Sequence, residues 1–151
     1  MSLIKILSVI IFLLSTSICE AQLKEYISGE IGIACDFSGQ PTPSVNRMVT
    51  LLKGSNFSSI EKYLDSRTIA NRVLSVMVLE ILEERGDRKL SKKTKQKILE
   101  IYNLDHEVNL CSGCTYYESI SAKDFLDRKK KNIMREEIEN WILRQQKSKE
   151  N

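Results

Sequence analysis

Apolar residues occupy nearly every position of one segment in the middle of the chain. Across Val73–Leu82 only Ser75 and Glu80 are polar. A helix that is apolar almost all round is usually a buried helix, because it has no face to turn towards water. The pattern therefore predicts a helix over residues 67–85 that forms the centre of the core.

Four further segments carry apolar residues at a spacing of three and four, which predicts amphipathic helices. The first two cover residues 44–53 and 58–64, and the third begins after a cap at Ser91. The last begins at a capping box, Ser121–Asp124, and is expected to run as one long helix to about Gln146. Together with the central helix they predict an all-α fold, a small domain of about five helices.

The start of the mature chain shows a different pattern. Residues Tyr26–Phe37 alternate with a period of about two, which is typical of extended backbone. Two glycines weaken this segment as a strand, and no second strand-like segment is found to pair with it. We therefore expect an extended arm over 22–43, a helical domain over 44–147 with a loop at 105–120, and a frayed tail at 148–151.

Residues 65–82 resemble the second helix of a HEAT repeat. The matching features are Asp65 in the turn, Arg72 early in the helix, Ser75 and Val78 at close-packed positions, and Leu79 with Leu82 at the end. Residues 48–64 stand where the first helix of such a repeat would lie, and no second copy follows. The resemblance implies helical-hairpin packing and, from the usual role of that family, protein binding.

The first 21 residues have the parts of a secretory signal. Lys5 precedes the apolar run Ile6–Leu14, and small residues lead to Ala21. This run is well short of the roughly 20 apolar residues that a membrane-spanning helix needs. We expect cleavage after Ala21 and an exported chain, periplasmic or extracellular, that has no membrane span.

The composition is that of a single globular domain. The chain has 151 residues, 42% of them hydrophobic and 28% charged, with a net charge of +3. These values exclude collagen-like, disordered and multi-span membrane proteins. Basic runs at 88–97 and 128–131 lie beside acidic residues and contain no aromatic residues. We interpret them as solvated helix ends and expect no binding of nucleic acid.

Export changes the interpretation of the cysteines, because disulfides persist outside the cytoplasm. The mature chain keeps Cys35, Cys111 and Cys114. The short spacing favours a structural disulfide between Cys111 and Cys114, with Cys35 close to them. The alternative joins Cys35 to Cys111 or Cys114 and closes a longer ring. By restricting the unfolded chain, this ring would stabilise the fold by about 4.5 kcal/mol, compared with about 2 kcal/mol for the ring between Cys111 and Cys114.

The same cysteines allow two chemical alternatives. A thiol–disulfide oxidoreductase uses such a pair where a strand leads into a helix, a context that the predicted elements lack. A tetrahedral zinc site would use Cys35, His106, Cys111 and Cys114, although only one short-spaced pair is present.

No other motif in the sequence points to a particular catalytic or ligand-binding chemistry. With a single His and no Gly-x-Ser-x-Gly motif, no catalytic triad can be assembled. The sequence therefore predicts a non-enzymatic binding protein that needs no cofactor and whose partner is another protein. A thiol–disulfide protein that uses Cys111 and Cys114 is the alternative function.

Overall fold

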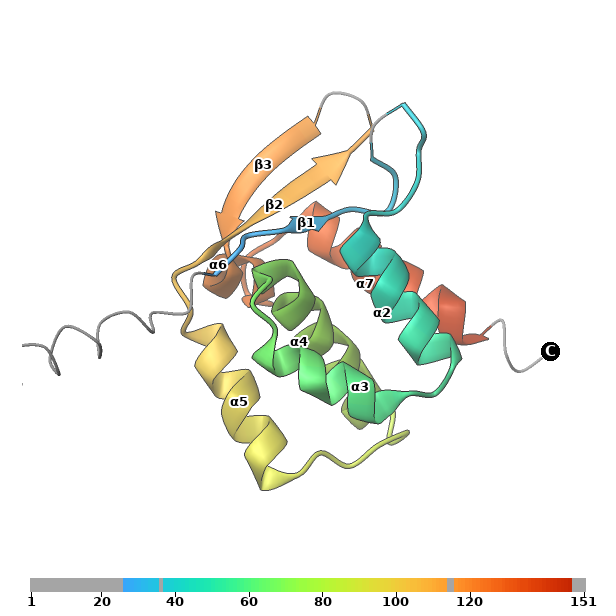
Figure 1. The fold of residues 1–151 in the computed structure, drawn as a ribbon, viewed down its shortest axis with the longest axis vertical. Helices are drawn as coiled ribbons and strands as arrows, with labels where there is room; N and C mark the ends of the chain where they lie inside the picture. Colours follow the sequence, from blue (N-terminus) through green and yellow to red (C-terminus); the bar gives the residue numbers. More distant parts are fainter. Residues whose placement is uncertain (1–25, 36, 114–115, 148–151) are drawn as a thin grey trace, which may run out of the picture.

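The computed structural model of the protein describes residues 26–35, 37–113 and 116–147. Helices lie beneath one face of a small three-stranded sheet, which makes two layers (Figure 1). In chain order the elements are β1 (Glu30–Ile31), α2 (Pro43–Lys53), α3 (Phe57–Lys62), the 3-10 helix η2 (Tyr63–Asp65), α4 (Ile69–Glu84), α5 (Lys92–Tyr102), β2 (Glu107–Ser112), β3 (Tyr116–Ser121), α6 (Ala122–Leu126) and α7 (Ile133–Lys147).

The predicted all-α fold is wrong, because most of the loop predicted at 105–120 forms a β-hairpin. Strands β2 and β3 pair antiparallel, from Glu107 opposite Ser121 to Ser112 opposite Tyr116. Strand β1 joins β2 in parallel, so that the order is β1-β2-β3. Each hairpin strand has only six residues, and such a short alternation is hard to recognise before the strands are paired.

Part of the N-terminal arm becomes β1. Ile31 lies beside Leu110 of β2, and both side chains are fully buried against the helices. Ile27 and Phe37, which the alternation placed on the same face as Ile31, are 61% and 96% exposed. The apolar face of the arm is therefore fully buried at Ile31, where the arm pairs with β2, whereas Ile33 packs partly buried against the core.

The core is centred on α4, which confirms the prediction from the apolar run. Every residue from Ile69 to Leu79 is buried. The polar residues among them make hydrogen bonds inside the core: Ser75 Oγ donates to Asn71 O at 2.9 Å, and Arg72 Nε donates to the main-chain oxygen of Ser66. Helices α2, α3, α5 and α6 and strand β2 all pack against α4.

The long helix predicted after Ser121 is two helices. Ser121 Oγ accepts a hydrogen bond from Asp124 N at 3.1 Å and caps α6, as the capping box predicted. Helix α6 ends at Leu126, and Asn132 Oδ1 then accepts a hydrogen bond from Arg135 N at 3.0 Å at the start of α7. A side-chain cap at this point favours a new helix start over continuation, and the chain turns between the two helices.

Candidate functional site

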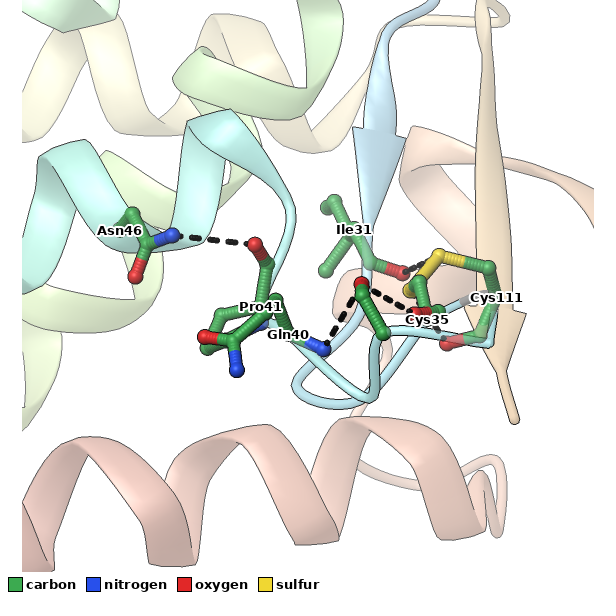
Figure 2. The surroundings of a disulfide bond; sticks show 7 residues. Ile31, Cys35, Gln40, Pro41, Asn46 and Cys111 are labelled. Atoms are coloured by element: carbon green, nitrogen blue, oxygen red, sulfur yellow. Dashed lines mark hydrogen bonds between the residues drawn. A yellow bond between two sulfur atoms is a disulfide. The ribbon is translucent and has the colours of Figure 1, made fainter. Parts of the chain in front are cut away.

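A disulfide bond joins the N-terminal arm to the sheet. Cys35, in the loop after β1, is bonded to Cys111 near the end of β2, with 5.5 Å between their Cα atoms (Figure 2). Gly113 N donates to Ala34 O at 2.6 Å, and Cys35 N donates to Gln40 O at 2.9 Å. These main-chain bonds hold the loop over the end of β2.

This pairing replaces the predicted short ring between Cys111 and Cys114. Cys111 is bonded to Cys35, which is the long alternative, and Cys114 lies outside the described residues. The physical reason is the parallel pairing of β1 with β2, which carries the arm along the sheet to Cys111. Proximity along the chain favoured the short ring, and proximity in space decided the bond.

Both cysteines of this bond are shielded from solvent. Cys35 is 5% exposed and Cys111 is 1% exposed. Thiol–disulfide exchange requires an attacking thiolate to reach one of the sulfur atoms, so a buried bond is a poor substrate for it. The burial supports a structural role for the bond, in which it holds the arm on the sheet.

Gly32 leaves the space that this bond needs. A Cβ atom at Gly32 would lie 2.3 Å from Cys111 O and 2.3 Å from Cys35 Sγ. We expect Gly32→Ala to lower the free energy of unfolding by about 1–3 kcal/mol, as overpacking of a filled interior does. Equilibrium urea denaturation measures this. Gly54→Ala is the matched control, because Gly54 has a φ of −75° that any residue adopts. Equal losses in the two variants would contradict the assignment.

His106 does not join Cys35 and Cys111 in a metal site, and Cys114 of the predicted zinc set lies outside the described residues. His106 precedes β2, and Cys111 lies five residues further along, which is about 16 Å at the rise of a strand. The His106 ring instead packs edge-on against Tyr26 with 4.7 Å between ring centres, and Arg72 Cζ lies 4.6 Å from the centre of the same Tyr26 ring. Among the described residues, no three His, Cys, Asp or Glu side chains gather as a metal site.

The face of the sheet that points away from the helices is polar. Val108 and Leu110 of β2 are buried, whereas Glu107 and Asn109 alternate with them and are exposed. Ser119 Oγ donates to Glu107 Oε2 at 2.8 Å and lies 3.2 Å from Asn109 Oδ1. We define the outer sheet face by the residues Glu30, Glu107, Asn109, Tyr117 and Ser119.

Strand β3 forms one edge of the sheet. Ala122 N donates to His106 O at 2.7 Å, which marks these two residues as a hydrogen-bonded antiparallel pair. Because such pairs alternate with non-hydrogen-bonded ones, the main-chain groups of Glu118 point towards β2 and those of Ser119 point away from it. No further strand lies beside β3 in the part of the chain that the structure describes. The main chain of Ser119 therefore faces an open edge.

The segments that build the sheet carry no basic side chains. Residues 26–46 and 98–122 contain no Lys or Arg, although the whole chain has a net charge of +3. Glu30, Glu107 and Glu118 are exposed in these segments. This cluster of acidic residues was not among the features predicted from the sequence. The sequence signal for it is the absence of Lys and Arg from residues 26–46 and 98–122. These two segments lie far apart in the chain but share this charge pattern.

The basic runs lie at the start of α5 and in the segment between α6 and α7, and five of their side chains form ion pairs with nearby carboxylates. This is consistent with their interpretation as solvated helix ends. The ion pairs are Arg88–Glu61, Lys95–Glu83, Lys97–Asp65, Arg128–Glu84 and Lys130–Asp124.

A second polar cluster joins α4, α5 and the segment before α7. Tyr102 Oη donates to Glu80 Oε2 at 2.9 Å, and Arg128 Nη2 lies 3.8 Å from the same oxygen. Burial raises the pKa of Glu80, although the hydrogen bond from Tyr102 and the charge of Arg128 oppose this. Burial and the neighbouring Glu80 carboxylate raise the pKa of Tyr102. Tyr102 therefore stays protonated and acts as a hydrogen-bond donor that ties α5 to α4.

Comparison of the chain with protein-family models, with curated proteins and with solved structures finds no match. In the described part of the chain, no helix is long and apolar enough to cross a membrane. The likeness of residues 65–82 to a HEAT repeat stays a prediction. Function has to be inferred from the residues of the site, and the open edge of the sheet is its most distinctive feature.

Proposed function

We propose that this chain is an exported, non-enzymatic binding protein that takes up an extended segment of another protein at β3. The observation that carries the proposal is the open edge at Ser119, where main-chain N–H and C=O groups face away from β2. An edge strand of this kind is a template for a further strand, and main-chain hydrogen bonds then supply much of the affinity.

The sequence of β3 does little to block such pairing. Proteins commonly protect an exposed edge with Pro, Lys or a bulge. Strand β3 reads Tyr-Tyr-Glu-Ser-Ile-Ser, so it has neither Pro nor Lys, and its six pairs with β2 run without interruption. Glu118 is the only charged residue in the strand. The open edge at Ser119, in a strand with neither Pro nor Lys, supports a role in binding.

Two observations support export. Residues 1–21 have the pattern of a secretory signal, although they lie outside the described residues. The Cys35–Cys111 disulfide is compatible with an oxidising compartment, where such bonds persist. Its burial gives the alternative function, thiol–disulfide exchange, less support than binding. Intact mass of the exported protein tests cleavage, and we expect its first residue to be Gln22.

The test of binding uses a displayed library of random ten-residue peptides, with the full exported protein as bait. We expect selected peptides to bind the wild type and Ser119→Ala but not Ser119→Pro. Proline removes the outward N–H and fills the space beside the strand, while the hydrogen bonds to β2 come from the neighbouring residues. The alanine variant loses the same hydroxyl but keeps the N–H.

Circular dichroism and thermal denaturation of both variants establish that they are folded. A library that yields no binder would contradict the proposed function. Peptides that bind Ser119→Pro as tightly as the wild type would show that β3 is not the binding surface.

A further inference from the structure

We infer that two copies of this chain form a symmetric dimer, in which Phe37 of each copy enters a hollow beside the start of α7 of the other. The inference goes beyond the proposed function, because it concerns the loop after β1 and helix α7 instead of β3. Three observations carry it: an exposed aromatic side chain on a fixed loop, a hollow on the same chain that accepts it, and the position of both at the end of β2.

Phe37 is exposed on a loop whose shape is fixed. Its side chain is 96% exposed, although large apolar side chains are usually inside a protein. The Cys35–Cys111 disulfide and a hydrogen bond of 2.9 Å from Cys35 N to Gln40 O hold the two ends of the loop. Within the loop, Ser38 Oγ donates to Cys35 O at 3.4 Å. Because the loop is already ordered, Phe37 loses little conformational freedom when a partner covers it.

A hollow of about 310 Å³ opens between the end of β2 and the start of α7. The residues that line it are Ser112, Ile133, Met134 and Glu137. Ile133 is 66% exposed, so an apolar surface meets solvent here as well. An apolar cavity of about 150 Å³ is enough to hold benzene, and the phenyl ring of a Phe side chain therefore fits the hollow.

The loop and the hollow adjoin the same end of β2. Ser112 lines the hollow and directly follows Cys111, which is bonded to Cys35 at the base of the loop. Figure 1 shows the loop after β1 beside the arrowhead of β2. The exposure of Phe37 shows that its ring does not fill the hollow of its own chain. With ring and hollow at one end of the molecule, a two-fold axis between them allows both contacts to form at once, and the assembly closes as a dimer.

A second copy is the favoured occupant because this chain supplies both halves of the contact. Each buried Phe side chain removes about 150–250 Å² from water, so two of them and the walls that they cover bury roughly 800 Å². The rims of the hollows add to this area. Interfaces below about 1,200 Å² belong to weak, reversible assemblies, so we expect a dimer that forms as the concentration rises. A lipid surface is disfavoured, since residues 26–46 contain no Lys or Arg for anionic head groups.

The test is sedimentation equilibrium of the full exported protein over a range of concentrations. We expect the wild type to dimerise, and Phe37→Ser to raise the dissociation constant at least about hundredfold, because each dimer loses two aromatic contacts. Ile133→Glu should also weaken the dimer, since it places a carboxylate in the hollow. Ile133 is the first residue of α7, where an acidic side chain suits the helix dipole, so this variant should fold.

Ile27→Ser is the matched control, because Ile27 is an exposed apolar residue of the same arm that lies before β1. It should leave the dissociation constant within about twofold. Circular dichroism establishes that all three variants are folded.

Photocross-linking identifies the contact directly. The variant Phe37→p-benzoylphenylalanine keeps an aromatic ring, and equal amounts of isotope-labelled and unlabelled protein distinguish links between copies from links within one copy. We expect light to join residue 37 of one copy to the α7 peptide that contains Ile133 of the other.

Three results would overturn the inference: a wild type that stays monomeric at every concentration, a dimer that Phe37→Ser leaves intact, and equal weakening by Ile27→Ser. Cross-links confined to a single copy would also overturn it, because the ring would then lie on its own chain. The proposed function is tested separately. Ser119→Pro should leave the dimer unchanged, and Phe37→Ser should still bind the peptides selected at β3.

Discussion

Replacing both Cys35 and Cys111 by serine is expected to lower the free energy of unfolding by about 4.5 kcal/mol. The two residues are 76 positions apart in the chain, so the bond closes a long ring and removes much of the freedom of the unfolded state. Equilibrium denaturation in urea, with the reduced wild type as a second reference, measures the loss. The largest local effect should be at β1, since the bond holds the arm against β2, and hydrogen exchange at Ile31 N–H would report it.

Cys114→Ser is the matched control for this experiment. The structure bonds Cys111 to Cys35, so we expect Cys114→Ser to leave the stability within about 0.5 kcal/mol of the wild type. Mapping of the disulfide by mass spectrometry should find a peptide that contains Cys35 linked to one that contains Cys111. A loss in Cys114→Ser as large as that in Cys111→Ser would restore the short ring that the spacing in the sequence favoured.

Leu79→Ala is expected to lower the free energy of unfolding by about 2–5 kcal/mol. Leu79 has no exposed surface and lies in α4, the helix against which α2, α3, α5 and α6 pack. Truncation removes apolar contacts and leaves a cavity that the surrounding helices fill only in part. Thermal denaturation followed by circular dichroism measures the change.

Lys93→Ala serves as the surface control, because Lys93 is exposed in the first turn of α5. It should change stability by less than about 0.5 kcal/mol. Similar losses in Leu79→Ala and Lys93→Ala would show that α4 is not the centre of the core.

The sequence alone determined the features that depend on near neighbours in the chain. The run around Leu79 predicted the buried helix α4, and the apolar spacing predicted α2 close to its observed bounds and the start of α5. Ser91 caps α5, since its side chain accepts a hydrogen bond from Thr94 N at 3.1 Å, and Ser121 caps α6 in the same way. Each of these caps joins two residues that are three positions apart, so it can be recognised from the sequence.

Only the tertiary structure decided the sheet, the disulfide and the candidate site. Strands β2 and β3 are too short and too polar to be recognised singly, and they become strands because they pair with each other and with β1 over a helical layer. The choice of Cys35 over Cys114 as the partner of Cys111 follows from that pairing. The open edge at Ser119 exists only once the order of the strands is set. These properties depend on contacts between distant residues, and local patterns of the sequence do not contain them.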